Sequence, residues 1–433
     1  MKFYSTNNKS LRVTLREAVL QGLAPDKGLY MPERIPSLPA GFFDAAGERS
    51  MQEIAFVVAH EFVSDDIDDN TLSSIISHAI PFDAPVVGID DNIYALELFH
   101  GPTFAFKDFG ARFMAGLLGH FAQQEGREVV ILVATSGDTG SAVANGFLGV
   151  PGTRVIVLYP QGKVSEIQEK QFTTLGQNIT ALEVNGTFDD CQRLVKQAFV
   201  DPELTQSLFL TSANSINVAR LIPQSFYYIH AYAQVRHLDL PLVFAVPSGN
   251  FGNLTGGLLA MKMGLPVAHF VACTNVNDVV PEYLDSGLFR PRPSIQTISN
   301  AMDVGNPSNF ARMLDLYDND RDAMAAVILG RAFTDEETRD AIRDVFERTG
   351  YILDPHGAVG YLGIRSYLSQ HGPAAGVFLE TAHPGKFLEV VEETLGKSIE
   401  LPEGLKAFAA GKKQSVPMSK EFGDLKEYLL SVR

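Results

Sequence analysis

The chain has 433 residues, of which 45% are hydrophobic and 20% charged, and its formal net charge is −16. Because single hydrophobic cores seldom grow beyond about 250 residues, this length predicts a globular protein with more than one lobe. The negative charge repels nucleic acids and anionic membrane surfaces, so we expect neither as a partner. An anionic ligand must therefore be held by local backbone N–H groups and a few Lys or Arg side chains.

The N-terminal sequence indicates where in the cell the protein is expected, and the two cysteines indicate whether it has disulfides or a metal site. Residues 1–9 lack the apolar core of a signal peptide, and no apolar run reaches the roughly 18 residues that span a bilayer. We therefore expect a soluble, cytoplasmic protein. Cys191 and Cys273 are far apart in the sequence, which supports neither a disulfide framework nor a metal site, and we interpret both as packing residues.

The first 85 residues mix helical patterns with turn signals such as 25–28 and 36–39, and Pro81 and Pro85 mark their end. We predict a small, mostly helical N-terminal domain over residues 1–85. Two short strands, 86–89 and 93–98, should follow it.

From Glu128 onward, short apolar segments alternate with helical ones, which is typical of an α/β fold with a mainly parallel sheet and helices on both faces. The clearest predicted strands are 129–133, 154–158, 242–245, 270–272 and 376–379. The predicted helices are 140–148, 165–175, 188–199, 217–235, 254–263 and 334–348, the last beginning with a Thr334–Glu337 capping box. The Lys-rich tail after about residue 398 is expected to pack on the surface.

Two loops that follow predicted strands have the composition of anion sites. Residues 134–141 and 247–253 are both rich in Gly, Ser, Thr or Asn and both lead into a helix. Backbone N–H groups at the positive end of a helix can converge there on an anion. Neither loop has the spacing of a P-loop or a dinucleotide fingerprint. An ordinary turn explains one such loop equally well, but two in one chain favour a phosphorylated ligand.

Lys107 lies in the segment 100–110, among four aromatic or imidazole side chains. Loss of water around a lysine disfavours the ammonium form, lowers the pKa and leaves an amine able to react with a carbonyl group. From this segment alone, a surface lysine whose stem covers apolar neighbours is the favoured alternative.

Five blocks of the sequence, taken together, resemble the threonine synthase family in its longer, bacterial and fungal form. They are residues 100–114, 134–141, 214–220, 247–253 and 380–387, and the segments 17–24 and 28–32 extend the resemblance over nearly the whole chain. The resemblance implies a two-lobed α/β core of fold type II, as in pyridoxal-phosphate enzymes like tryptophan synthase β, with the cofactor in the cleft. This core would cover residues 86–397, with a mobile lobe at about 127–235 and a C-terminal extension over 398–433.

The resemblance also implies a cofactor site. Lys107 matches the lysine that binds pyridoxal 5′-phosphate covalently, and Thr381 matches the hydroxyl residue that hydrogen-bonds the pyridine nitrogen, although a helix N-cap explains Thr381 equally well by itself. The loop that holds the cofactor phosphate is matched by Ser248, Gly249, Asn250, Phe251, Gly252 and Asn253. We expect positive φ angles at Gly249 and Gly252, where the backbone must approach the phosphate closely.

The residues implied to bind substrate come from two other blocks. The segment that grips the substrate amino acid, chiefly its α-carboxylate, is matched by Thr135, Ser136, Gly137, Asp138 and Thr139. Asp138 stands where many relatives of the wider fold place asparagine, so its contact with an anionic cofactor oxygen would need a shared proton. The block that binds the substrate phosphate is matched by Asn214, Ser215 and Arg220, with Asn217 as the expected N-cap of the following helix.

The implied reaction converts O-phosphohomoserine and water into threonine and phosphate, with Lys107 as cofactor anchor and general acid/base. A related phospho-lyase that releases phosphate and 2-oxobutyrate is one alternative. A non-catalytic protein that only binds a phosphorylated ligand is another, although the presence of Lys107 speaks against it. We expect no metal site, and a monomer or homodimer.

Overall fold

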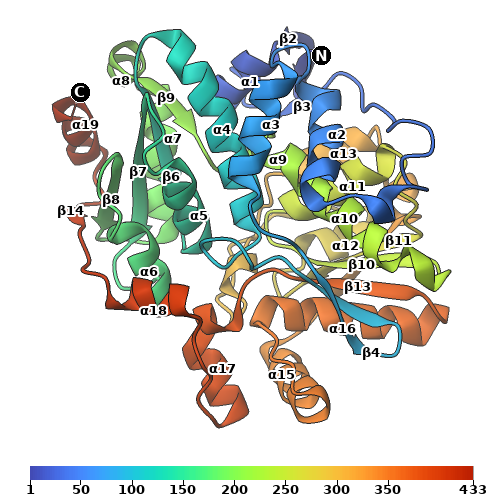
Figure 1. Ribbon diagram of the computed structural model, residues 1–433. Helices are drawn as coiled ribbons and strands as arrows, with labels where there is room; N and C mark the ends of the chain where they lie inside the picture. The colour runs from blue at the N-terminus through green and yellow to red at the C-terminus, as the bar shows by residue number, and fades with distance from the viewer. Residues whose placement is uncertain (433) are drawn as a thin grey trace.

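The computed structural model describes residues 1–432 and contains three sheets (Figure 1). The N-terminal sheet has the order β2-β1-β3 and consists of β1 (Phe3–Ser5), β2 (Asn8–Val13) and β3 (Tyr30–Pro32). The helices beside it are α1 (Leu15–Gln21), η1 (Ala46–Glu48), α2 (Met51–Val63) and α3 (Asp69–Ala79). The helical character of this region was predicted, but its antiparallel sheet was not.

A six-stranded sheet with the order β12-β11-β10-β13-β5-β4 forms the larger lobe. Its strands are β4 (Val86–Asp90), β5 (Ile93–Glu97), β10 (Leu242–Pro247), β11 (His269–Thr274), β12 (Ile328–Ala332) and β13 (Ala375–Glu380). Strand β4 pairs antiparallel with β5, whereas the other neighbours are parallel. Every residue of β10 and β13 is buried, which explains their continuous apolar sequences.

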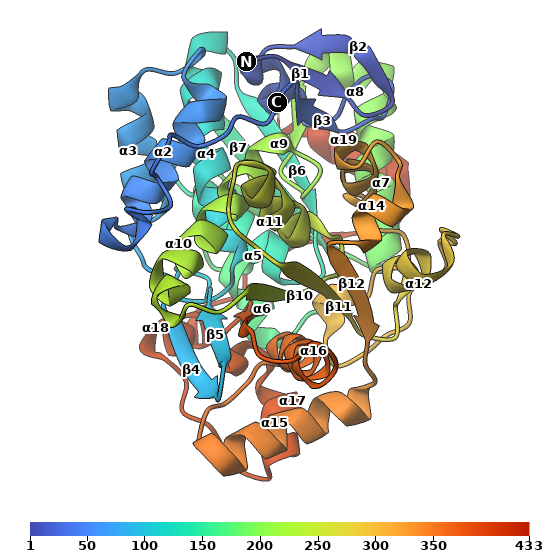
Figure 2. The same cartoon turned by 90° about the vertical axis from the view of Figure 1, so that its right-hand side faces the viewer.

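Helices cover both faces of the six-stranded sheet (Figure 2). They are α10 (Phe226–Val235), η3 (Arg236–Leu238), α11 (Gly252–Lys262), α12 (Val279–Ser286), η4 (Asn300–Met302), α13 (Phe310–Leu316), α14 (Arg321–Ala325), α15 (Asp335–Thr349), α16 (Pro355–His371), η5 (Pro384–Phe387) and α17 (Leu388–Leu395). Alternate residues of β10 enter two cores: Phe244 packs with the residues of α10 and α11, and Ala245 with those of α15 and α16.

The smaller lobe contains a parallel five-stranded sheet with the order β14-β8-β7-β6-β9. Its strands are β6 (Val129–Ala134), β7 (Thr153–Pro160), β8 (Ile179–Val184), β9 (Phe209–Ser212) and β14 (Val416–Met418). The helices around it are α4 (Lys107–Glu125), α5 (Asp138–Phe147), α6 (Glu166–Thr173), α7 (Phe188–Val200), α8 (Pro202–Ser207), α18 (Glu403–Ala410) and α19 (Phe422–Ser431). The C-terminal segment thus returns to this lobe, with β14 beside β8 (Figure 1).

The predicted strands and most predicted helices are present, and the capping box at Thr334 is confirmed. The helix predicted over 217–235 is interrupted, because Pro223 lacks a backbone N–H: it consists of α9 (Val218–Leu221), the 3₁₀ turn η2 (Ile222–Ser225) and α10.

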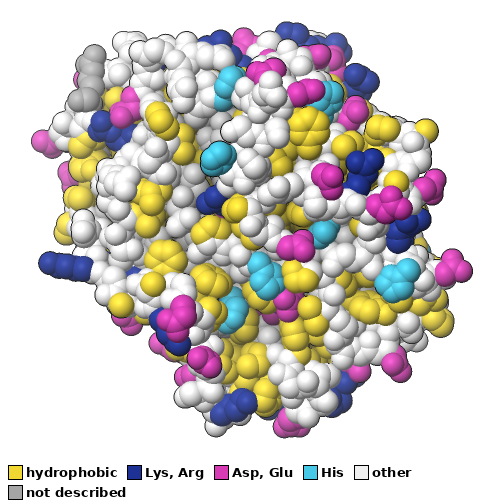
Figure 3. All heavy atoms as spheres, in the orientation of Figure 1, with side chains coloured by type: hydrophobic (Ala, Val, Ile, Leu, Met, Phe, Trp, Pro, Cys, Tyr) yellow, Lys and Arg dark blue, Asp and Glu magenta, His cyan; other side chains and the backbone are white. Residues whose placement is uncertain are grey.

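Both cysteines are buried and free, in agreement with a packing role. Within residues 1–432, none of the helices is long and apolar enough to cross a membrane. Acidic and basic side chains are intermixed on the face in Figure 3.

Candidate active site

Lys107 is the first residue of α4, and the loop before it is tied to the loop that follows β13. The Phe106 backbone N–H donates to the Thr381 carbonyl at 2.9 Å, and Ala105 forms an isolated antiparallel bridge with Ala382. The sequence-predicted residues Lys107 and Thr381 are therefore held next to each other by backbone contacts.

The Lys107 side chain is only 16% exposed, which disagrees with an exposed surface lysine. Its Nζ lies 3.8 Å from Asp138 Oδ2. Burial lowers the pKa of Lys107 to about 8, against the opposing effect of Asp138 and with a further lowering by Lys386 and Arg220. An amine with this pKa is partly neutral near neutral pH, so it can both react with a carbonyl group and carry protons.

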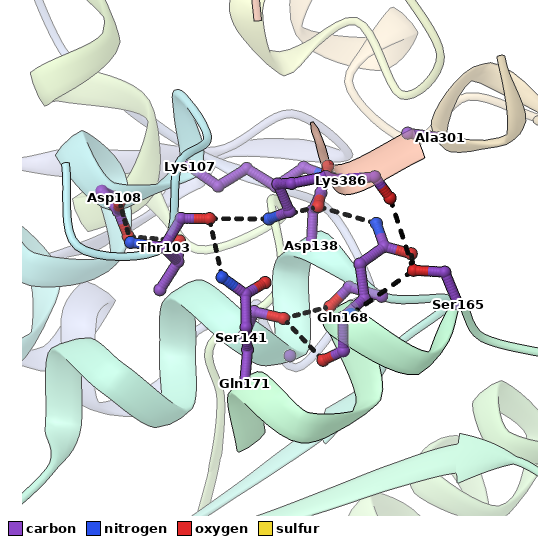
Figure 4. Close-up of polar contacts among 12 residues, drawn as sticks. Thr103, Lys107, Asp108, Asp138, Ser141, Ser165, Gln168, Gln171, Ala301 and Lys386 are labelled. Atoms are coloured by element: carbon purple, nitrogen blue, oxygen red, sulfur yellow. Dashed lines mark hydrogen bonds and ion pairs between the residues drawn. The ribbon is translucent and has the colours of Figure 1, made fainter. Parts of the chain in front are cut away.

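Asp138 is held by a second lysine that the sequence interpretation did not include (Figure 4). Lys386 Nζ donates to Asp138 Oδ1 at 2.7 Å, and Gln168 Nε2 donates to the same oxygen at 2.8 Å. Burial acts to raise the pKa of Asp138, but Lys386 and Lys107 outweigh it and hold this pKa well below its usual range. Lys386 lies within the block 380–387 that carries the family resemblance, and this was its only sequence signal.

The loop between β6 and α5 is organised by Thr135. Its buried Oγ1 accepts hydrogen bonds from the Gly137 N–H at 3.0 Å and the Gly140 N–H at 2.8 Å. These contacts leave the Thr135 hydroxyl engaged within the loop. They fix the start of α5, where the first N–H groups have no intrahelical acceptor and can receive an anion.

The loop between β10 and α11 has a different backbone from the one expected. The positive φ lies at Phe251, with a value of 58°, and not at Gly249 or Gly252 as predicted, because the chain reverses into α11 at Phe251. Ser248 is engaged in the sheet: its N–H donates to the Cys273 carbonyl and its Oγ to the Val246 carbonyl, both at 2.8 Å. The later N–H groups of this loop are therefore the candidates for binding an anion.

A buried amide donor points at the start of α11. A Cβ built on Gly252 would lie 3.3 Å from Asn309 Nδ2, which is buried and has no hydrogen-bond partner among residues 1–432. Arg312 Nη1 donates to Asn309 Oδ1 at 2.7 Å, and this contact orients the amide. An unpaired buried donor costs about 1–3 kcal/mol unless a ligand accepts from it. The donors here fit the phosphate of pyridoxal phosphate, and neither Asn309 nor Arg312 was predicted from the sequence.

The third predicted block reaches both loops. Asn250 Nδ2 donates to Ser215 Oγ at 3.1 Å, and Asn214 Nδ2 donates to the Ala134 carbonyl at 3.4 Å. Asn253, in contrast, directs its side chain toward α10, where Oδ1 accepts from the hydroxyls of Tyr227 and Tyr228. Of the predicted residues, Asn253 is thus the one whose side-chain oxygen serves the packing of α10 and α11.

Arg220 is a buried cation without a carboxylate partner in the described chain. It belongs to α9, whose N-cap is Asn217 as predicted, and it is 4% exposed. Its Nη1 donates to the Ala213 carbonyl at 2.5 Å, whereas its Nε has no partner within residues 1–432. Burial lowers its pKa to about 10. With only four residues in α9, the helix dipole contributes little, so the burial itself is what favours an anionic ligand.

Models of known families match the chain in three parts. A model described as pyridoxal-phosphate dependent enzyme matches residues 80–379, one described as threonine synthase N terminus matches residues 2–80, and one described as threonine synthase, C-terminal, matches residues 357–429. A threonine synthase of Serratia marcescens is 44% identical over 434 residues, which cover all of both chains.

Solved structures agree with these matches. A threonine synthase crystal structure from Escherichia coli has a TM-score of 0.93 and 42% identity, with all of both chains covered. A pyridoxal-phosphate-bound threonine synthase from Brucella melitensis has a TM-score of 0.93 and 34% identity, covering 99% of this chain and 98% of that one. A threonine deaminase from Solanum lycopersicum is only 16% identical, with a TM-score of 0.57, and shows the shared core fold alone.

Proposed function

Because the chain belongs to the threonine synthase family of pyridoxal-phosphate-dependent enzymes, we propose that Lys107 is its cofactor-binding lysine and its proton carrier. The protein is a pyridoxal-phosphate-dependent lyase that converts O-phosphohomoserine and water into threonine and phosphate. The observation that carries the assignment of Lys107 is its burial beside Asp138, with a pKa of about 8.

The β10–α11 loop and its neighbours would hold the cofactor. The phosphate would accept from the N–H groups between Gly249 and Gly252 and from Asn309 Nδ2, which otherwise lacks a partner among the described residues. Thr381, whose backbone carbonyl accepts from the Phe106 N–H, would meet the pyridine nitrogen through its hydroxyl. When bound, the cofactor supplies an electron sink that stabilises negative charge on the substrate carbons.

Two further groups would hold the substrate. The N–H groups at the start of α5, arranged by Thr135, would bind the α-carboxylate. Arg220, with Ser215 and Asn214 nearby in the chain, would bind the phosphate that leaves, because a guanidinium can hold a phosphate through two parallel hydrogen bonds.

Lys107 Nζ would then move the protons. It would take a proton from Cα and return protons to the substrate carbons as phosphate departs and water adds at Cβ. A group serves best as both acid and base when its pKa is close to the working pH, which the pKa of about 8 satisfies. Asp138 faces Lys107 at 3.8 Å and would favour its protonated form.

The test is incubation of the protein with O-phosphohomoserine while phosphate and threonine are measured together. Equal release of both is expected. Phosphate accompanied by 2-oxobutyrate would instead indicate the phospho-lyase, and absence of phosphate release a non-catalytic phospholigand-binding protein.

The division of the chain is also a proposal. We propose an N-terminal domain of residues 1–85, a catalytic core of residues 86–397 with a mobile lobe at about 127–235, and an extension over 398–433, and the separate N-terminal sheet supports the first of these divisions. The substrate is a small molecule, whereas the cytoplasmic location and the monomeric or homodimeric state stay predictions.

A further inference from the structure

A second lysine, Lys386, occupies the centre of the site and has no role in the proposed function. Its side chain is completely buried, and its Nζ donates to Asp138 Oδ1 and to the Thr103 carbonyl, both at 2.7 Å (Figure 4). A lysine is rarely buried to this extent without a partner, because removing its charge from water costs several kcal/mol. Asp138 supplies that partner.

Asp138 lies between two ammonium groups. Its Oδ2 is 3.8 Å from Lys107 Nζ, and its Oδ1 is 2.7 Å from Lys386 Nζ. The shorter of the two contacts is the one to Lys386, so a large part of the carboxylate's charge is offset before it acts on Lys107. Any change at Lys386 therefore alters the field at Lys107.

The contact also connects the two sheets. Asp138 begins α5, which follows β6 of the five-stranded sheet, whereas Lys386 lies in η5, which follows β13 of the six-stranded sheet. Thr103, the other acceptor of Lys386, lies in the loop before α4. Lys386 thus holds the Asp138 carboxylate from the opposite side of the site.

Few charged groups reach Lys107. They are Asp138 from α5, Lys386 from η5 and Arg220 from α9. Asp138 in turn is met by the two lysines and by the uncharged amide of Gln168. The neighbouring carboxyl of Asp108 accepts from the Thr103 N–H and hydroxyl. Burial raises its pKa to about 6, against these hydrogen bonds and the charge of Lys386.

We propose that Lys386 is a positioning residue, which holds the Asp138 carboxylate against Lys107 and offsets part of its charge, and so sets how readily Lys107 Nζ gains and loses a proton. The proposal rests on Lys107 being the cofactor-binding lysine of the proposed function. Lys386 acts through Asp138 and carries no proton to the substrate itself.

The test follows the absorption band of the lysine-bound cofactor in the holoenzyme as pH is varied, because this band reports protonation at Lys107 Nζ without turnover. Lys386→Gln keeps a donor for the Thr103 carbonyl but removes the charge, so Asp138 should favour protonated Lys107 more strongly. The pH at the midpoint of the change in this absorption band, called the midpoint below, should rise by about one pH unit or more. Asp138→Asn removes the favourable carboxylate, and its midpoint should fall.

A control variant and a double variant separate this role from a structural one. In Lys426→Met, which removes a lysine bonded to Asp201 and Glu203 on the surface, the midpoint should match that of the unmodified protein. Asp138→Asn/Lys386→Gln should have the midpoint of Asp138→Asn alone, because Lys386 acts by holding and offsetting a carboxylate that both variants lack. Shifts that add in the double variant would overturn the proposal.

If Lys386 has only a structural role, Lys386→Gln should lower the unfolding temperature and leave the midpoint unchanged. That result would also overturn the proposal. If Lys386→Gln does not fold, Lys386→Arg takes its place: it keeps the charge beside Asp138, so the midpoint of the unmodified protein is expected, and a shift of one pH unit or more overturns the proposal. Failure of the proposed function is distinct: in that case Lys107→Ala keeps the absorption band, whatever the midpoints of the other variants.

Discussion

The Phe106 backbone N–H donates to the Thr381 carbonyl at 2.9 Å, so the residue before Lys107 is fixed to the proposed partner of the pyridine nitrogen. One backbone contact thereby joins the segments that carry Lys107 and Thr381, the residues proposed to hold the cofactor ring. Such a contact does not depend on side-chain rotamers, and it holds the backbone of Lys107 beside that of Thr381.

Replacement of Lys107 by alanine should remove the absorption band of the lysine-bound cofactor and nearly all turnover, because the other amine of the site, Lys386 Nζ, is engaged by Asp138 and by the Thr103 carbonyl. Cofactor bound without a covalent link should persist, since the β10–α11 loop is unchanged. Spectroscopy and a phosphate-release assay measure both effects. Lys262→Ala, which removes a lysine over the Tyr317 ring, is the control. Turnover of Lys107→Ala within about tenfold of the unmodified protein, a barrier change of ~1.4 kcal/mol, would contradict the assignment.

Gly252→Val should weaken cofactor binding more than it weakens the fold. Its Cβ would lie 3.3 Å from Asn309 Nδ2, in the space where a phosphate oxygen would accept from that amide. Gly330→Ala in β12 is the matched comparison, because its Cβ would lie 2.6 Å from Pro281 Cα and must displace backbone outside the cofactor loop. We expect Gly330→Ala to lower the free energy of unfolding by about 1–3 kcal/mol. Cofactor titration and urea unfolding separate the two effects, and a fully loaded but less stable Gly252→Val would place the phosphate elsewhere.

Arg220→Lys should lower catalytic efficiency by one or more powers of ten, each ~1.4 kcal/mol, while cofactor loading stays intact. The reason is that lysine keeps the charge but loses the planar pair of donors that holds a phosphate. Steady-state kinetics with O-phosphohomoserine measure the loss. Arg112→Lys is the control, since Arg112 donates to the carbonyls of Ala79 and His78 at the end of α3. Unchanged efficiency in both Arg220→Lys and Arg220→Ala would remove Arg220 from the site.

Asp108→Asn should stabilise the protein increasingly as pH rises. Burial raises the pKa of Asp108 to about 6, above its ordinary value of 3.8. The folded protein therefore binds the extra proton between about pH 4 and 6, and the cost of the buried charge is complete above pH 6 and absent below pH 4. Asparagine carries no such cost, so its advantage should grow across this window by on the order of a few kcal/mol.

Urea unfolding of Asp108→Asn at pH 4 and pH 7.5 checks this prediction. The exposed Asp91 in the turn between β4 and β5 provides the control, because Asp91→Asn should show the same small difference at both values. An Asp108→Asn advantage that is independent of pH would mean that the carboxyl is ionised in the fold at both values.

The sequence predicted those parts of the fold that have a local signal. Buried strands such as β10 and β13 are continuous apolar runs, and they were placed correctly. Strand β12 contains Gly330 and Arg331, and β14 is three residues long with Pro417 at its centre, so neither resembles a buried strand and both were missed.

The residues of the candidate site likewise divide into those that a sequence motif marks and those that only the fold reveals. Lys107, Asp138 and Arg220 lie in motif blocks, and the fold brings these blocks together through contacts such as Asn250 with Ser215. Asn309 lies outside these blocks, and no local pattern marks it. Lys386 lies in the block 380–387, but nothing in that block singles it out before the fold brings it to Asp138. The positive φ predicted for the glycines lies at Phe251, because the geometry of the reversal, and not residue type alone, decides which residue takes it.

The pairing of β14 with β8 has a consequence for how the chain folds during synthesis. Val416–Met418 form the outer strand beside Leu182–Val184, so the smaller sheet is completed by residues made more than 200 positions after its other strands. Until the ribosome has passed Met418, the edge of β8 presents unpaired backbone groups, which are prone to pair with another chain. The nascent chain therefore exposes the edge of β8 until Val416–Met418 have been made and can pair with it.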